Sequence, residues 1–146
     1  MNPGHIARVQ MAEQFRHKTD LYGGIFGSKQ IGIDGSENYH HKSKAEALND
    51  YMFSVVIENC EYDTYFTEKI TDCFATGTLP IYFGTEQVKD YFDKDGIIFL
   101  GANLDVAQLT PDLYQSKMNS VKQNFYAVNK MVSADDFLYR KIINLI

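Results

Sequence analysis

The sequence predicts an α/β fold, a Rossmann-like parallel sheet flanked by helices, on the strength of three short apolar segments and the helices between them. Residues 51–57, 79–83 and 96–100 have the composition of buried strands. Strands joined by single helices form parallel sheets with right-handed crossovers. Because ligands bind such sheets beyond the carboxyl ends of the strands, we expect a site in the loops that follow these segments.

The N-terminal third leads into the first of these strands. Apolar residues at near-helical spacing predict a helix from Ile6 to Phe15, and residues 20–22 are typical of a short strand. Residues 27–41 are rich in Gly, Ser, Asn and His, which predicts a long exposed loop. Residues 42–50 favour a short helix, and the apolar segment after it is expected to be the central strand.

Helices are predicted for most of the remaining chain. One runs from about Thr67, a plausible N-cap, to Thr76, and Gly77 stops it. Its inward residues are expected to be Ile70, Phe74 and Ala75. A second helix covers residues 85–92, helical spacing continues through residues 110–128, and a last helix spans about Ala134 to Leu145.

Composition narrows the function classes. The net charge of −5 argues against a partner held by counterion release, so no nucleic acid is expected. Cys60 and Cys73 fit neither a disulfide framework nor a metal spacing, which indicates free thiols. Since the sequence shows no signal peptide and no membrane-spanning apolar run, we expect a cytoplasmic protein.

Two features could suggest a metal site, and both are better explained without one. Asp93-Lys94-Asp95 matches a DxD pattern, but it is expected before a strand, far from the carboxyl ends. His40 and His41 are adjacent and have no Cys or carboxylate at ligand spacing. We therefore expect no metal and no other cofactor.

Residues 57–69 carry the most chemistry, because they connect a buried strand to the start of a helix. A helix N-terminus offers free N–H groups and a positive dipole end to a phosphate. Lys69 would oppose that dipole unless an anion binds there, Glu68 could accept hydrogen bonds from ribose hydroxyls, and Tyr65 offers a hydroxyl. On spacing alone, an ordinary capped helix with a solvated Glu-Lys pair is an equal alternative.

Three blocks in this region resemble the donor-binding region of the family 10 α-1,3-fucosyltransferases. They are YMFSVVIEN (residues 51–59), YFTEKI (residues 65–70) and ATGTLPIYFG (residues 75–84). The family shows a strand ending in Glu-Asn, a Thr-Glu-Lys helix start and a Gly-Thr-x-Pro turn, in that order. The sequence departs from the family at Met52, where lysine is usual, and at Cys60, where serine is usual.

The resemblance implies the C-terminal half of a GT-B glycosyltransferase that binds GDP-fucose. In that case Glu68 would hold the ribose, Lys69 the diphosphate, and Tyr65 would lie beside the phosphates or fucose. An upstream basic residue also contacts the diphosphate in the family, and Arg8 is the first candidate, ahead of Arg16. The expected donor-binding set is Arg8, Glu58, Asn59, Tyr65, Thr67, Glu68 and Lys69.

The implied reaction is inverting transfer of fucose to a glycan acceptor, and its general base lies in the family's N-terminal acceptor domain. No segment of residues 1–146, interpreted as one nucleotide-sugar-binding domain, corresponds to that domain, so we expect no catalytic base here. The acceptor half would then come from a longer chain, a separate polypeptide or a homo-oligomer. The alternative is a catalytically silent nucleotide- or partner-binding module that retains the Rossmann-like core.

Overall fold

The computed structural model describes residues 3–15, 18–22, 44–45, 47–101, 104–132 and 134–143. The helices are α1 (Pro3–Phe15), α3 (Glu68–Thr76), α4 (Pro111–Ser116), α5 (Met118–Asn129) and α6 (Ala134–Ile143). The strands are β1 (Phe53–Ile57), β2 (Leu79–Phe83) and β3 (Ile98–Phe99). The short 3₁₀ helices are η1 (Glu86–Asp90), η2 (Lys94–Gly96) and η3 (Val106–Gln108).

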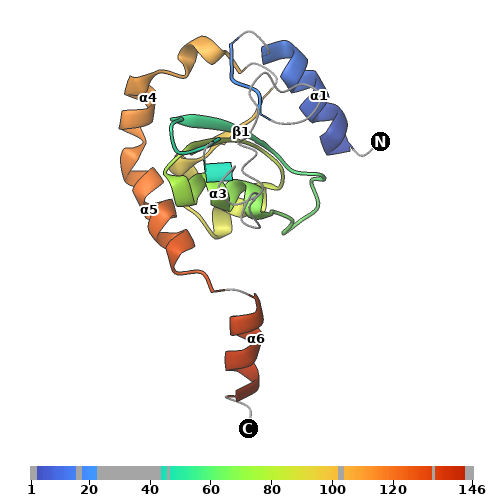
Figure 1. Cartoon of the computed structure of the whole chain (residues 1–146), viewed down its shortest axis with the longest axis vertical. Helices are drawn as coiled ribbons and strands as arrows, with labels where there is room; N and C mark the ends of the chain where they lie inside the picture. The colour runs from blue at the N-terminus through green and yellow to red at the C-terminus, as the bar shows by residue number, and fades with distance from the viewer. Residues whose placement is uncertain are drawn as a thin grey trace, which may run out of the picture.

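The three strands form an open parallel sheet in the order β1-β2-β3. Helices flank the sheet, which confirms the predicted Rossmann-like α/β fold (Figure 1). Among the described strands β2 is the middle one, so the expectation that residues 51–57 form the central strand is wrong for this sheet. The apolar run does not distinguish a middle strand from an edge strand, because it reports only that both faces of the strand are apolar.

One face of the sheet carries the hydrophobic core. Val56 and Tyr82 are paired in register and project onto α3, where they pack with Ile70 and Phe74. Ile70 and Phe74 have no exposed surface, as predicted, whereas Ala75 is exposed and Cys73 is buried instead. The reason is the helical repeat: position 73 lies on the face of Ile70, three residues on, and position 75 does not.

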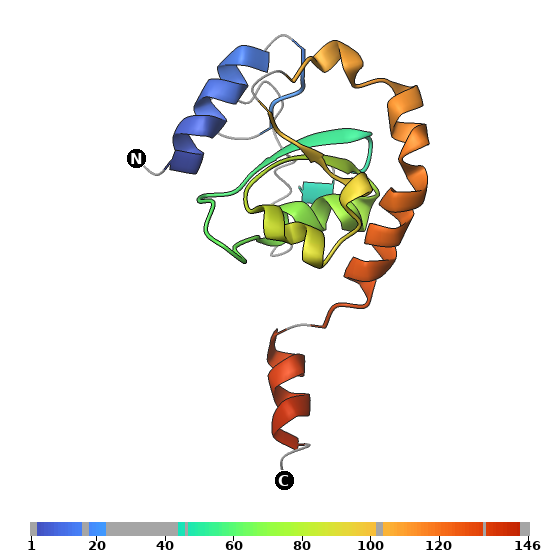
Figure 2. The ribbon, with the colours of Figure 1, turned by 180° about the vertical axis from the view of Figure 1, so that it is seen from behind.

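The opposite face of the sheet is covered by α1. Side chains alternate along a strand, so Val55 and Ile57 point away from α3. These two residues line a cavity of about 1020 Å³ together with residues of α1 such as Val9 and Ala12. Figure 2 shows α1 and α3 on opposite sides of the strands. Because α1 leaves this space open, Val55 is 39% exposed.

The C-terminal helices close the other edge of the core. α5 packs against α3 and η2, and the buried Asn124 of α5 both accepts a hydrogen bond from the Asp93 N–H at 2.7 Å and donates one to the Asp93 carbonyl at 3.0 Å. α6 lies apart from the sheet in both views (Figures 1 and 2). The predicted end of this last helix, Leu145, lies outside the described residues.

Several predicted elements are shorter or tighter than expected. Residues 85–92 contain a 3₁₀ helix in place of an α-helix, and residues 96–100 contain a two-residue strand preceded by a 3₁₀ turn. Residues 110–128 form two helices separated at Lys117. Of residues 20–22 only Tyr22 makes a strand-like bridge, and Lys44 and Ala45 are helical in the described part of 42–50. The loop predicted for residues 27–41 lies outside the described residues.

Candidate functional site

The loop between β1 and α3 lies at the carboxyl edge of the sheet, where the fold predicts a ligand. Glu58 extends the pairing of β1 by one residue, since its N–H donates to the Phe83 carbonyl at 2.9 Å. The chain then crosses to Thr67, which caps α3 with its side-chain oxygen, and Gly77 ends the helix in the left-handed conformation at φ 73°. Both predicted helix boundaries are confirmed.

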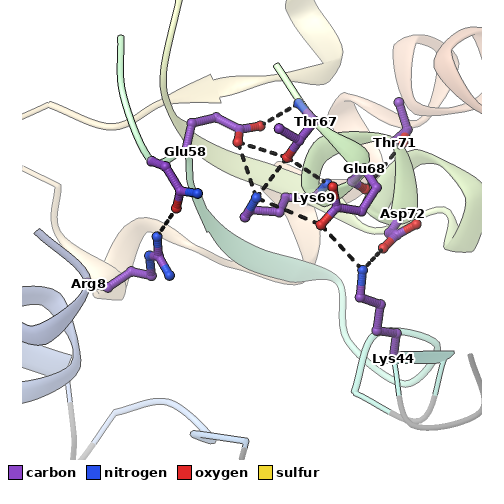
Figure 3. Close-up of polar contacts among 9 residues, drawn as sticks. Arg8, Lys44, Glu58, Thr67, Glu68, Lys69, Thr71 and Asp72 are labelled. Carbon is purple, nitrogen blue, oxygen red and sulfur yellow. Dashed lines mark hydrogen bonds and ion pairs between the residues drawn. The ribbon is translucent and has the colours of Figure 1, made fainter. Parts of the chain in front are cut away.

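The side chain of Glu58 is fully buried and accepts hydrogen bonds from the start of α3. Its Oε1 accepts from the Thr67 backbone N–H at 2.9 Å, and its Oε2 accepts from the Thr67 hydroxyl at 2.8 Å. Lys69 Nζ adds an ion pair to Oε2 at 3.4 Å. The carboxylate therefore ties the end of β1 to the first turn of α3 (Figure 3).

The ammonium group of Lys69 lies between two carboxylates. Besides Glu58, it contacts Oε1 of Glu68 at 3.7 Å and donates to the Thr67 hydroxyl at 2.8 Å. The side chain is 29% exposed, so the charge is held near the surface and within reach of a ligand. A cation fixed beside the N-terminus of a helix is suited to an anionic oxygen.

Glu68 has the most exposed carboxylate of this network. Its Oε1 also lies 3.6 Å from Lys44 Nζ, and Lys44 is further bound to Asp72 at 2.9 Å. Burial raises the pKa of the Glu68 carboxyl, but a backbone hydrogen bond and the charges of Lys69 and Lys44 outweigh it and hold the pKa below its ordinary value. Glu68 is therefore an ionised acceptor with open surface, which suits hydroxyl groups of a sugar.

A second basic side chain reaches the same loop from α1. Arg8 donates a hydrogen bond to the Asn59 side-chain oxygen. Asn59 directly follows Glu58 in the chain, so Arg8 and Lys69 are anchored on adjacent residues. Figure 3 shows Arg8 reaching toward this loop from α1. Within the described residues, Arg8 Nε and the Tyr82 hydroxyl are the buried side-chain nitrogen and oxygen atoms without a hydrogen-bond partner. Arg16, the second candidate, lies outside the described residues.

Tyr65 lies on the loop just before the helix and is half-buried. Its N–H donates to the Tyr62 carbonyl at 3.0 Å, which closes a turn. Inside this turn Thr64 has a φ of 62°, a conformation that a β-branched residue rarely adopts. Burial raises the pKa of the nearby Tyr82 phenol, and the charges of Glu58 and of Tyr65 raise it further.

The structure brings six of the seven sequence-predicted residues into two contact groups: Arg8 with Asn59, and Glu58, Thr67, Glu68 and Lys69 together. Tyr65 lies on the same loop without a hydrogen bond to either group among the contacts of the described residues. The sequence reasoning missed Asp72 and also Lys44, which contacts both Glu68 and Asp72, because these contacts depend on how a distant segment packs. The i, i+4 spacing of Glu68 and Asp72 is the sequence signal from which their position on one helix face could have been predicted.

Other predictions on site chemistry can be compared with the described part of the chain. Asp93 caps η2 ahead of β3, at the starting edge of the strand as expected. Cys60 and Cys73 are free thiols. Residues 40 and 41 are not described. Among the described residues, no three His, Cys, Asp or Glu side chains group as metal ligands, and no helix has the length and apolarity to span a membrane.

An open parallel sheet with charged side chains gathered at its carboxyl edge is the arrangement in which α/β proteins of this class bind their ligands. The chain belongs to glycosyltransferase family 10: the family model described as "Glycosyltransferase family 10 (fucosyltransferase) C-term" matches residues 2–135. The resemblance is thereby confirmed, and the chain is a member of a fucosyltransferase family.

Individual relatives agree with the family. The chain is 42% identical over 57 residues to an alpha-(1,3)-fucosyltransferase FucT of Helicobacter pylori. These residues are 38% of this chain and 12% of that protein. The chain is 26% identical over 130 residues to alpha-(1,3)-fucosyltransferase B of Drosophila melanogaster. This alignment covers 86% of this chain and 29% of that protein. An alpha-(1,4)-fucosyltransferase of Arabidopsis thaliana is 36% identical over 52 residues, 36% of this chain and 13% of that protein. The chain thus spans less than a third of the length of these relatives, and no solved structure matches it.

Proposed function

We propose that these residues form the donor-binding half of an inverting, α-1,3-fucosyltransferase-like enzyme whose donor is GDP-fucose and whose acceptor is a glycan. The observation that carries the proposal is the anchoring of two cations on adjacent residues of one loop, Arg8 on Asn59 and Lys69 on Glu58. Two positive groups on one loop suit the two charges of a diphosphate, and the α3 N-terminus adds its dipole.

Each side chain has a separate role in the proposal. Lys69 and Arg8 hold the diphosphate, and the ionised Glu68 carboxylate accepts hydrogen bonds from the ribose hydroxyls. Tyr65 lies beside the phosphates or the fucose. Thr67 and Asn59 fix the loop, Thr67 as the helix cap and Asn59 as the acceptor for Arg8.

The reaction follows from the leaving group. The acceptor hydroxyl oxygen bonds to the anomeric carbon of fucose from the face opposite GDP, and the bond from that carbon to the β-phosphate oxygen breaks. GDP leaves with the electron pair, and the hydroxyl proton passes to a general base. Arg8 and Lys69 stabilise the charge that grows on the diphosphate, which is the usual electrostatic contribution at such leaving groups. This role needs no metal.

The base and the acceptor groove are assigned to a part of the enzyme other than residues 1–146. The relatives are three to eight times longer than the stretch that matches, judging from the 29% and 12% coverage. We propose that the acceptor-binding half comes from the rest of a longer chain, from a second polypeptide or from a homo-oligomer. The family match favours this enzyme over a silent binding module.

Calorimetric titration with GDP, UDP and ADP tests the donor class. The proposal predicts that GDP binds at least about tenfold more tightly than either alternative, a difference of ~1.4 kcal/mol. Equal binding of all three, or binding of none, would contradict it. GDP binding without fucose transfer, once an acceptor-binding half is supplied, would instead support the silent module.

A further inference from the structure

Glu58 differs from the other acidic residues of the site in being closed to solvent. Its relative exposure is 0%, whereas the Glu68 carboxylate is 57% exposed and that of Asp72 is 33% exposed. Transfer of a carboxylate into a protein interior costs several kcal/mol unless donors surround it. A cost of that size has to be offset by specific contacts.

Three donors offset it, and all three belong to the first residues of α3. They are the Thr67 backbone N–H, the Thr67 hydroxyl and the Lys69 ammonium, and together they use both carboxylate oxygens. The Thr67 hydroxyl also accepts from Lys69. Glu58, Thr67 and Lys69 therefore form a closed ring of contacts (Figure 3).

A helix start does not need this arrangement for stability. The Thr67 side chain already caps α3 by accepting from the Lys69 N–H, and a neutral cap is worth about 1 kcal/mol. The surface carboxylate of Glu68 already pairs with Lys69. The buried carboxylate of Glu58 is therefore not needed as a helix cap. What it adds is a fixed position for the Lys69 ammonium.

The surroundings of Glu58 leave its side chain little freedom. A β-carbon placed on Gly84 would come 2.9 Å from Glu58 Cγ, so the backbone of β2's end runs directly beside the side chain. The Tyr82 phenol lies at the same place. A side chain confined in this way can hold a partner in one geometry.

We propose that Glu58 is a positioning residue for the donor diphosphate. It holds the Lys69 ammonium and the first turn of α3 where the phosphate oxygens bind, and it does not itself touch the donor. The sequence groups Glu58 with the donor-binding residues, where it closes the strand and shapes the loop, and the inference adds that it fixes the position of Lys69. It rests on the proposed function, because it takes the diphosphate as the ligand of Lys69.

Positioning and charge make opposite predictions for Glu58→Gln. By Coulomb's law alone, removal of a negative charge near an anion site tightens binding of the anion. If Glu58 instead positions Lys69, the neutral glutamine releases the ammonium and weakens binding. The sign of the change therefore separates the two accounts.

The experiment measures the GDP affinity of the wild type, Glu58→Gln, Lys69→Ala and the double variant, well below the melting temperature of each. We expect Glu58→Gln to weaken GDP binding by about tenfold or more in the wild type, and by less than about threefold when Lys69 is alanine, because coupled residues are not additive. Glu86→Gln is the matched control, since Glu86 is exposed and, among the described residues, forms its ion pair with Lys89. It is expected to bind GDP like the wild type.

Thr67 gives a second, independent test should Glu58→Gln fail to fold. Thr67→Val removes the hydroxyl that links Glu58 to Lys69, whereas Thr67→Ser keeps it. We expect weaker GDP binding in the valine variant than in the serine variant, and equal binding in the two would overturn the positioning role. The positioning role would be overturned if Glu58→Gln bound GDP as tightly as the wild type or more tightly. It would also be overturned if Glu58→Gln lost the same GDP affinity with and without Lys69. A wild type that binds no GDP would overturn the proposed function, and the positioning role with it.

Discussion

Gly84 and Tyr82 meet at the carboxyl end of β2 more closely than any other residue at position 84 would allow. A β-carbon on Gly84 would lie 2.3 Å from the Tyr82 hydroxyl oxygen and 2.9 Å from Glu58 Cγ. Contacts below 3 Å are not tolerated between carbon and these atoms. The glycine thus lets the backbone pass directly over the residues that support the site.

Gly84→Ala is expected to destabilise the fold by about 1–3 kcal/mol, the usual cost of overpacking, and to weaken GDP binding by displacing Glu58. Gly101→Ala is the matched control, because nothing lies within 4 Å of its β-carbon. Denaturant unfolding of both variants measures the difference. Equal stability of the two would show that the Gly84 contact is relieved without cost.

Thr64 stores backbone strain in the turn before Tyr65. Its φ of 62° is left-handed, which costs a β-branched residue about 1–2 kcal/mol and asparagine considerably less. Thr64→Asn should therefore raise the melting temperature, as measured by thermal unfolding. An unchanged or lower melting temperature would mean that the turn is not strained.

The two cysteines are expected to differ in reactivity. Burial raises the pKa of the Cys73 thiol to about 12, so almost no thiolate exists at neutral pH, whereas Cys60 is only partly buried. A thiol reagent at pH 8 should modify one cysteine in the native protein and the second only after unfolding. Cys60→Ser should abolish the fast reaction; a fast reaction that persists in this variant would contradict the burial of Cys73.

Stability should depend on pH through Glu68. Its folded-state pKa is lower than the ordinary 4.5, so its contribution is present above that value and is lost as the pH falls through the lower, folded-state pKa. The melting temperature of the wild type should exceed that of Glu68→Gln at neutral pH, and the gap should narrow below pH 4.5. Because the carboxylate is over half exposed, added salt should also narrow it. A gap that widens toward acid would contradict the assigned charge contacts.

Local features of the site were predictable from sequence, and contacts between distant segments were not. The cap at Thr67 and the stop at Gly77 are set by single residues and their neighbours, so both helix boundaries could be predicted from the sequence. Burial of Glu58 depends on Gly84 and Tyr82 from the next strand, and its polar residue type predicts exposure. The family resemblance supplied the donor roles that spacing alone left open.

The fold shows the same division. The parallel α/β class follows from alternating apolar strands and helices, which is a property of the chain itself. The exposure of Val55 depends on how closely α1 covers the sheet, and the short β3 depends on how η2 is held by Asn124. Neither of these is encoded in a local pattern.

The GDP affinity of Lys69→Ala tests most directly whether residues 57–69 form the diphosphate site. Lys94→Ala is the control, because Lys94 is exposed and precedes β3 at the opposite edge of the sheet. The account predicts a loss of about 1–3 kcal/mol for Lys69→Ala, the scale of a charge-assisted hydrogen bond, and no loss for Lys94→Ala. Equal GDP affinity in the two variants would contradict it.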